Sequence, residues 1–412
     1  MEVVHERCAG LDVHKKTVVA CVLVSGPQGT VHATVQTFPT MTADLERLSA
    51  WLVEQRVSNV ALESTGVYWV PVYNLLEEAG LAVSLVNPQH MRAVPGRKTD
   101  VADSKWLADL LRHGLLRASF IPPVAIRELR EVVRYRTTLV RERTQEVNRL
   151  QKVLESANIK LAAVATDILG VSGQLMLEAL AAGEEDPEVL AELAQRKLRA
   201  KLDQLRQALD GRVKGHHRTL IRALLAHITF LQGAVEELDA EVGRRLVPMQ
   251  QAVQHLDSIP GVSAVAAAAI IAEIGVDMSR FASDKHLASW AGTCPGNKQS
   301  GGKRLSGKTT RGDVWLRAIL GQVAWAAIRK KGSSFGARYR RIAKRQGKQK
   351  ALVAVMHSLL RVIYAVLRDG VPYQELGPEY YQPQDAARRA RAAVRQLEQL
   401  GYTVVAPPTQ AA

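Results

Sequence analysis

The stretch CAGLDVHKKTVVACVLV, residues 8–24, decides the fold of the N-terminal part of this 412-residue chain. It is rich in β-branched residues, which favour extended backbone, and the turn signal SGPQGT follows it at 25–30. The next segment, VHATVQTFP at 31–39, has the same character. Together these segments predict the start of a β-meander, in which consecutive strands run antiparallel.

Helices and strands alternate after this meander. The sequence predicts helices at 42–55, 67–80 and 99–114, separated by strands at 57–65 and 81–88. Thr42 is expected to cap the first of these helices and Gly80 to end the second. The order β-β-β-α-β-α-β-α indicates a mixed α/β domain with a buried sheet, which we place at residues 1–118.

Long helices are predicted after the α/β domain. Residues 124–157 contain neither glycine nor proline, and apolar residues recur there every three to four positions, as in an amphipathic helix. A second helical stretch covers about 187–246, with one interruption at GRVKGHH. Joined by a short-helix linker, the two stretches predict an antiparallel coiled-coil arm at 119–248. The arginines on its other faces fit a solvated surface, a subunit-pairing surface or a nucleic-acid surface.

The charge of the chain points to a polyanionic partner. Lysine and arginine number 55 against 40 aspartate and glutamate residues, which gives a net charge of +15 and a pI near 9.8. Nucleic acid is the commonest acidic partner, although a soluble basic protein without a polyanion has the same composition. Cys8, Cys21 and Cys294 form no disulfide or zinc pattern. Neither a signal sequence nor an apolar run of about 18 residues is evident, so we expect a cytoplasmic protein without a membrane partner.

Four carboxylates are predicted to meet at one end of the sheet. Asp12 lies in the first strand and Glu63 near the end of the strand 57–65, while Asp100 and Asp103 share one face at the start of a helix. Carboxylates crowded together repel one another unless divalent cations neutralise them. Oxygen ligands suit Mg²⁺ or Mn²⁺. A pair of such ions can hold the attacking and leaving oxygens of a phosphodiester. Singly, each residue fits a helix cap, a partner of the helix dipole or an exposed strand end. Together with the element order, which is that of the ribonuclease H-like fold, they indicate a nuclease-type metal centre.

The segment NKQSGGKRLSGKTTRGD, residues 297–313, combines serines with glycines and cations. Gly301 and Gly302 let the backbone approach a ligand closely. Phosphate oxygens can pair with the cations of this segment, Lys298, Lys303, Arg304, Lys308 and Arg311. This setting suits a hydroxyl that attacks phosphorus, although no base is evident nearby in the sequence. By composition alone, a flexible phosphate-binding loop without chemistry is the commoner explanation.

The segment LDSIPGVSAVAAAAIIAEIG, residues 256–275, has the form of a helix-hairpin-helix within a mainly α-helical domain at 249–370. Its Pro-Gly turn, with Gly261, lets backbone N–H groups face a phosphate. Ser263 replaces the usual second glycine, and a plain helical hairpin is the alternative. The remaining tail, 371–412, contains one charged helix and a mobile end.

These motifs resemble a known family. GLDVHK, ALESTG and KTDVADSKWLADLL are similar to the three acidic motifs of the IS110 class of DEDD transposases from bacterial insertion sequences, whose first domain is similar to the Holliday-junction resolvase RuvC. The resemblance covers most of residues 8–370. It implies a ribonuclease H-like (RuvC-like) domain with the metal ligands Asp12, Glu63, Asp100 and Asp103. It also implies phosphate or scaffold contacts by His14, Lys15 and Lys98, which plain surface charges explain as well.

A second resemblance concerns the C-terminal domain. AGTCPGNKQSGGK and TTRGDVWLRAIL resemble the C-terminal motif of the same transposases. In that motif the serine before the glycine pair is the proposed nucleophile, which forms a transient phosphoserine bond to DNA. The matching residue is Ser300, with Ser306 as the fallback.

The family resemblance also implies partners. In these transposases a structured non-coding guide RNA bridges target and donor DNA, and the arm pairs subunits into dimers and tetramers, so that the acidic domain of one subunit meets the serine of another. The leading hypothesis is therefore an RNA-guided DNA recombinase. The alternatives are a metal-dependent Holliday-junction-type endonuclease that uses water and a non-catalytic nucleic-acid scaffold. A tyrosine route through Tyr380 or Tyr381 lacks the accompanying Arg/His/Arg pattern.

Overall fold

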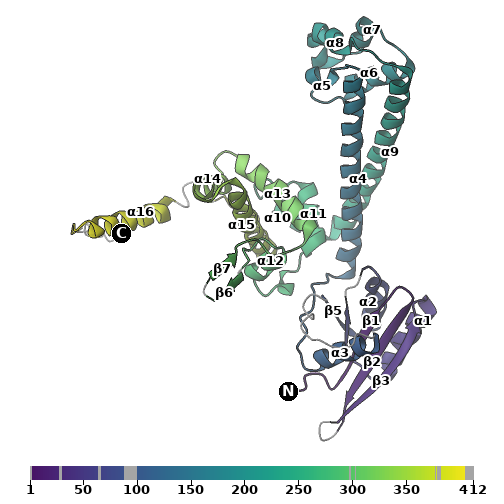
Figure 1. Cartoon of the computed structure of the whole chain (residues 1–412), viewed down its shortest axis with the longest axis vertical. Coiled ribbons are helices and arrows are strands. Elements are labelled where there is room, and N and C mark those ends of the chain that lie inside the picture. The colour runs from purple at the N-terminus through teal and green to yellow at the C-terminus, as the bar shows by residue number, and fades with distance from the viewer. Residues whose placement is uncertain are drawn as a thin grey trace. The chain divides into compact units, whose positions relative to one another are not determined.

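The computed structural model of the chain describes residues 2–26, 30–63, 66–87, 100–296, 298–301, 303–375, 377 and 382–403 (Figure 1). The chain divides into two compact units, Met1–Ile121 and Pro122–Ala412. The division falls close to the predicted end of the α/β domain at residue 118. The finer division into arm, C-terminal domain and tail stays a prediction.

A five-stranded sheet forms the centre of the first unit, in the order β3-β2-β1-β4-β5. The strands are β1 (Arg7–Val13), β2 (Thr17–Ser25), β3 (Val31–Pro39), β4 (Asn59–Glu63) and β5 (Ala82–Val86). β1, β2 and β3 form an antiparallel meander, whereas β4 runs parallel to β1, and β5 parallel to β4. This strand order and direction is the topology of the ribonuclease H-like fold, so the predicted fold of this unit is confirmed.

Helices cover both faces of the sheet. They are α1 (Thr42–Glu54), α2 (Trp69–Glu78) and α3 (Asp100–Arg112). Leu11 of β1 belongs to the core formed with α1 and α2, whereas Cys8 belongs to the core on the opposite face, formed with α3. A strand that is buried on both faces lies at the centre of a sheet, which explains the nearly continuous apolar character of β1. The expected cap of α1 is wrong by one residue, because Met41 and not Thr42 occupies the cap position.

Two long antiparallel helices, α4 (Val124–Ser156) and α9 (Gly215–Leu246), form an arm in the second unit (Figure 1). Polar contacts link Glu128 with Arg245, Arg136 with Asp239, and Glu146 with His227. Low residue numbers on α4 meet high numbers on α9, so the predicted antiparallel arrangement is confirmed. The coiled-coil packing of this pair stays a prediction.

A cap of short helices joins α4 to α9. It consists of α5 (Leu161–Val164), α6 (Val171–Ala182), α7 (Pro187–Glu192), a 3-10 helix at Arg196–Lys201 and α8 (Leu202–Leu209). Leu150 of α4, Met176 and Leu177 of α6, and Leu190 of α7 share its buried core. The second long helix therefore begins at Gly215 rather than near residue 187, because residues 210–214 are not helical and separate α9 from α8 of the cap.

A helical body with one small hairpin follows the arm (Figure 1). Its elements are α10 (Gln250–Asp257), α11 (Ala264–Ile274), α12 (Asp284–Trp290), β6 (Lys298–Ser300), β7 (Lys303–Ser306), α13 (Val314–Arg329), α14 (Ser334–Gln346) and α15 (Lys348–Asp369). Short 3-10 helices lie at Val247–Met249 and Met278–Arg280, and α16 (Gln382–Gln399) lies in the tail. The predicted mainly α-helical character of this region is confirmed.

Helix α15 forms the core of this body. Its residues Ala351, Val355, Leu359 and Ile363 recur every four positions and are fully buried, and the helix packs against α12, α13 and α14. Within the described part of the chain, α15 is also the one helix that is long and apolar enough to cross a membrane, by length and composition alone. The expectation that no such apolar stretch exists is thus wrong for α15, whose apolar face is used for packing.

Candidate active site

Strand register brings Asp12 and Glu63 to neighbouring positions. β1 and β4 pair in parallel with Leu11 beside Leu62, so the next residues along the two strands are Asp12 and Glu63. Side chains alternate along a strand, and Leu11 and Leu62 both pack on the side of α1 and α2. The two carboxylates therefore belong to the face of the sheet that α3 covers.

Helix α3 supplies the other two predicted carboxylates, Asp100 and Asp103, from its first turn. This helix is pressed against β1 at Gly10. A Cβ atom on Gly10 would lie 2.2 Å from the carbonyl oxygen of Ser104 and 2.4 Å from the backbone nitrogen of Ala108. Only glycine fits at this position, and it fixes the height of α3 above the strand. A lone glycine within a strand pattern is the sequence signal for such a close approach.

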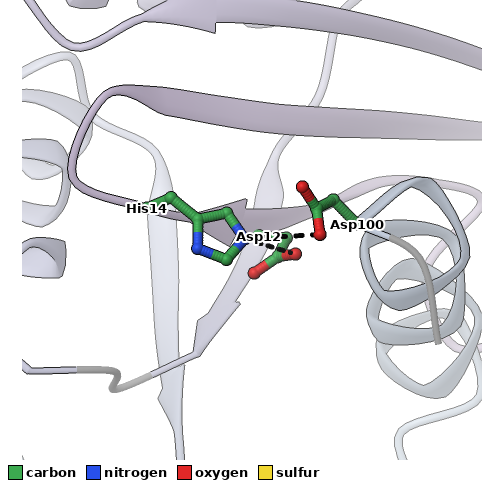
Figure 2. A group of neighbouring side chains, drawn as sticks. All are labelled: Asp12, His14 and Asp100. Carbon is green, nitrogen blue, oxygen red and sulfur yellow. Dashed lines mark hydrogen bonds and ion pairs between the residues drawn. The ribbon is translucent and has the colours of Figure 1, made fainter.

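Asp12, His14 and Asp100 converge between the end of β1 and the start of α3 (Figure 2). The Nε2 atom of His14 lies 3.2 Å from Oδ2 of Asp12 and 3.5 Å from Oδ1 of Asp100. One ligand atom from each residue lies within 4.8 Å of the others. The side chain of Asp12 is 13% exposed, whereas those of His14 and Asp100 are 46% and 59% exposed. A buried carboxylate is thus combined with two accessible groups.

The electrostatics of this cluster favour a cation. Burial raises the pKa of Asp12, His14 lowers it, and the charges of Asp100 and Asp103 raise it again. A bound cation would stabilise the ionised form of such a carboxylate. Carboxylate oxygens are the ligands that Mg²⁺ and Mn²⁺ prefer, so the residues present fit a divalent ion of this class, with His14 as an additional nitrogen donor. The ligand roles of all four carboxylates, Glu63 included, stay predictions.

Two lysines were predicted to contact phosphate beside the acidic motifs. Lys15 lies in the exposed turn between β1 and β2, where its carbonyl oxygen accepts a hydrogen bond from Oγ1 of Thr40 at 2.9 Å. Lys15 is exposed, so its side chain is accessible from solvent. Lys98 lies outside the described residues. A phosphate contact by either lysine stays a prediction.

Ser300 lies at the tip of the β6–β7 hairpin, which we call the serine hairpin (residues 298–306). Ser300 pairs with Lys303 across the two strands, and the exposed Gly301 follows it with a φ of +54°. Left-handed backbone in a tight turn favours glycine at this position. Gly302 and the side chains of residues 298–300 and 303–306 lie outside the described part of the structure. The roles predicted for Ser300, Ser306, Lys298, Gly301, Gly302, Lys303, Arg304, Lys308 and Arg311 stay predictions, and Tyr380 and Tyr381 also lie outside the described residues.

Close backbone contacts hold the base of the serine hairpin. The N–H group of Gly296 donates to the carbonyl oxygen of Lys308 at 2.9 Å, and a Cβ atom on Gly296 would lie 2.4 Å from that oxygen. A Cβ atom on Gly312 would lie 2.3 Å from backbone atoms of Ala291 and Gly292. The segments before and after the hairpin thus touch backbone to backbone, which anchors the hairpin to the helical body. The sequence pattern alone did not reveal this function of the glycines.

Gly261 lies in the turn between α10 and α11, with a φ of +85°. A Cβ atom there would lie 2.6 Å from backbone atoms of Val323 and Ala327 in α13. Ser263 caps α11, since its side chain accepts a hydrogen bond from the N–H group of Ala266. Packing on α13 explains this glycine without a ligand. Two helices joined by a tight turn are present, whereas a phosphate contact of the helix-hairpin-helix type stays a prediction.

Comparison with known proteins agrees with the acidic and serine motifs. Residues 9–159 match the DEDD profile of the IS110 type, described as "Transposase", and residues 253–340 match a profile described as "Transposase IS116/IS110/IS902 family". The chain is 25% identical to the transposase for insertion sequence element IS1111A of Coxiella burnetii, over 76% of this chain and 78% of that protein. It is 27% identical to a probable family 20 transposase of Pseudomonas aeruginosa, over 75% of this chain and 83% of that protein.

Among solved structures, the chain is similar to Thermus thermophilus RuvC, with 17% identity, a TM-score of 0.22, and coverage of 27% of this chain and 99% of that one. The two transposase profiles include both the acidic motifs and the serine hairpin, and the similarity to named transposases extends over about three quarters of the chain. The chain therefore belongs to the IS110 family of transposases, which are enzymes that act on DNA.

Proposed function

We propose that this transposase cuts and rejoins DNA strands through Ser300, with Mg²⁺ or Mn²⁺ held by Asp12, Glu63, Asp100 and Asp103. The observation that carries the proposal is the cluster at the end of β1, in which ligand atoms of Asp12 and Asp100 lie within 4.8 Å of each other. Membership of a transposase family makes a DNA phosphodiester the expected substrate of that cluster.

The chemistry of the proposal divides between the two units. A divalent ion in the acidic cluster would polarise the phosphodiester and stabilise charge on the leaving oxygen. Asp12 provides the buried anchor of the cluster and Asp100 its accessible edge. Ser300 loses its hydroxyl proton, forms a bond to phosphorus and displaces a DNA oxygen, which takes up a proton; rejoining reverses this step with the hydroxyl of another strand. The anchored base of the serine hairpin keeps Ser300 in position.

The proposal includes nucleic-acid partners. Its contacts are Lys15, Lys98, Gly261, Lys298, Gly301, Gly302, Lys303, Arg304, Lys308 and Arg311. We further propose that a structured non-coding RNA selects target and donor DNA, that the arm assembles the chain into dimers and tetramers, and that the protein is cytoplasmic. The net charge of +15 supports nucleic-acid partners, and the family resemblance supports the RNA and the assembly.

The test uses the full chain, the DNA of its element, Mg²⁺ and the RNA transcribed beside its gene. On a denaturing gel, the wild type should retain labelled DNA on protein, and mass spectrometry should place the bond on Ser300. Ser300→Ala should still bind nucleic acid but should form no adduct and exchange no strands. Ser306→Ala is the matched control and should form the adduct. Strand exchange by Ser300→Ala would show that another group is the nucleophile.

An endonuclease that uses water is the second candidate function. It is favoured by the location of the acidic cluster, which lies in the unit Met1–Ile121 without Ser300. Free cut ends without a protein adduct, unchanged in Ser300→Ala and lost in Asp12→Asn, would identify this activity. In that case the serine hairpin would bind phosphate only.

A further inference from the structure

An open groove lies beside the base of the serine hairpin. Its volume is about 1050 Å³. Lys308, just after β7, lines one side, and helices α14 and α15 line the other side with Arg338 and Lys350. His357, two turns further along α15, lines it as well. All of these residues belong to the second unit, whereas the residues of the acidic cluster belong to the first.

The lining of the groove combines cations with apolar surface. Lys308, Arg338 and Lys350 come from three different parts of the fold, and no carboxylate occurs among the described residues that line the groove. Val353 and Ala354 add an apolar patch. Nucleic-acid backbones present phosphates that pair with lysine and arginine, together with sugars that pack on apolar surface. The groove therefore has the chemistry of a backbone-binding channel.

Burial and nearby charges, including that of Arg338, affect the ionisation of His357. Burial lowers the pKa of His357, the charges of Arg361 and Arg338 lower it further, and Asp284 has the opposite effect. Its Nδ1 atom lies 3.9 Å from Sγ of Cys294. The effect of Arg338 on this pKa agrees with the excess of cations among the described residues that line the groove.

Only some cations of a basic segment line the groove. ARYRRIAKRQGKQK, residues 337–350, contains many cations, of which Arg338 and Lys350 line the groove. Lys348 is exposed on the same helix as Lys350 and is not part of the lining. The chain thus offers a matched lysine for a control substitution.

We propose that this groove binds the sugar–phosphate backbone of the DNA strand presented to Ser300, with Lys308, Arg338 and Lys350 as phosphate contacts. The inference rests on the proposed function, because it identifies where the strand beside the reacting phosphate is held. Five residues lead from Lys303, the partner of Ser300, to Lys308, which corresponds to about 17 Å of extended chain. At about 3.4 Å per nucleotide step, the groove holds phosphates roughly five steps from the reacting one. DNA is favoured over RNA because the strand that reaches Ser300 must continue past the base of its hairpin.

The first test measures DNA binding by the full chain without divalent metal, so that no strand is cut. Fluorescence anisotropy of a labelled duplex of arbitrary sequence gives the dissociation constant at several salt concentrations, and the slope of the double-logarithmic plot reports the number of phosphate contacts. Arg338→Ala and Lys350→Ala should each reduce that slope by about 1, and the double variant by about 2. Lys348→Ala should leave it unchanged. A double variant with the slope of Lys348→Ala would overturn the proposal.

A second measurement does not depend on the folding of the charge variants. A photo-crosslinking amino acid at Gln349, which lines the groove, should react with the element's DNA roughly five nucleotides from the cut, whereas the same amino acid at Lys348 should not. Crosslinks that form only with the RNA would overturn the assignment to DNA. Because this binding needs neither metal nor the Ser300 hydroxyl, failure of the proposed function would appear as a missing adduct with these results unchanged.

Discussion

The guanidinium group of Arg134 in α4 holds the carboxylate of Glu273 in α11 through two hydrogen bonds, from Nε to Oε1 at 2.8 Å and from Nη2 to Oε2 at 2.7 Å. Arg130, one turn earlier, donates to the backbone carbonyl oxygens of Ala272 and Glu273. Arg134 also donates to Asp313, which caps α13 after the serine hairpin. The side chain of Glu273 is only 3% exposed, so a buried charged cluster joins the arm to the helical body.

We expect Glu273→Gln to lower the free energy of unfolding by about 3–5 kcal/mol, because the substitution removes the buried carboxylate that Arg130 and Arg134 share and leaves only Asp313, among the described residues, to pair with Arg134. Denaturation followed by tryptophan fluorescence measures the loss, since Trp315 lies 5.6 Å from the Arg134 guanidinium. Glu241→Gln removes partly exposed pairs with Arg244 and Arg245 and should have little effect. Equal effects of the two substitutions would show that the buried pair does not stabilise the junction.

Gly10→Ala should weaken the acidic site from a distance. The added methyl group would meet the backbone of α3, 2.2 Å from the carbonyl oxygen of Ser104, so α3 must move and carry Asp100 away from β1. We expect a loss of about 1–3 kcal/mol in the free energy of unfolding and about tenfold weaker Mn²⁺ binding by calorimetric titration. Gly233→Ala, where an added Cβ meets nothing within 4 Å, is the control. Unchanged Mn²⁺ affinity in Gly10→Ala would show that this contact does not position the ligands.

Asp12→Asn should stabilise the metal-free protein near neutral pH. Since the pKa of Asp12 is raised by burial and by the neighbouring carboxylates, its contribution to stability is present below the unfolded pKa and is lost as the pH rises through the folded pKa. The neutral amide of the variant cannot ionise, so the variant does not lose stability as the pH rises. We expect thermal unfolding of the variant above that of the wild type at about pH 7.5, with the difference narrowing towards about pH 4. Added Mn²⁺ should reverse the order by stabilising the wild type only, and a variant less stable in every condition would contradict this account.

Gly312→Ala should impair the serine hairpin without touching the acidic cluster. Its Cβ atom would lie 2.3 Å from the backbone of Ala291, so the base of the hairpin must open. Protein–DNA adduct formation should fall by about tenfold or more while Mn²⁺ binding stays at the wild-type value, since a displacement near 1 Å has effects of this size. Gly321→Ala in α13, where nothing lies within 4 Å of the new Cβ, should retain full adduct formation. A normal adduct yield from Gly312→Ala would show that the hairpin tolerates an open base.

Features that depend on local periodicity could be predicted from the sequence. Local spacing of apolar residues predicted β1 and β2 from one β-branched run. It also predicted α4 from a long stretch without glycine or proline. The side-by-side placement of Asp12 and Glu63 also followed, because it needs only the expected pairing of two parallel strands.

Features that depend on contacts between distant segments could not be predicted in this way. The seating of α3 on Gly10 joins residues almost a hundred positions apart, and the contact of Gly312 with Ala291 depends on how the hairpin closes. The approach of His14 to Asp100 depends on the same seating of α3. The groove lined by Arg338 and Lys350 requires α14 and α15 to be placed beside the hairpin, which no local pattern specifies.

Because α4 and α9 run antiparallel, the arm begins and ends at the helical body, with Glu128 and Arg245 paired at its base. Equal lengths can therefore be removed from both helices, or added to them, without moving the two points of attachment. Each matched pair of residues changes the reach of the arm by about 1.5 Å. The spacing between the cap and the body that carries Ser300 can thus be altered in evolution, or by design, without changing the acidic cluster or the serine hairpin.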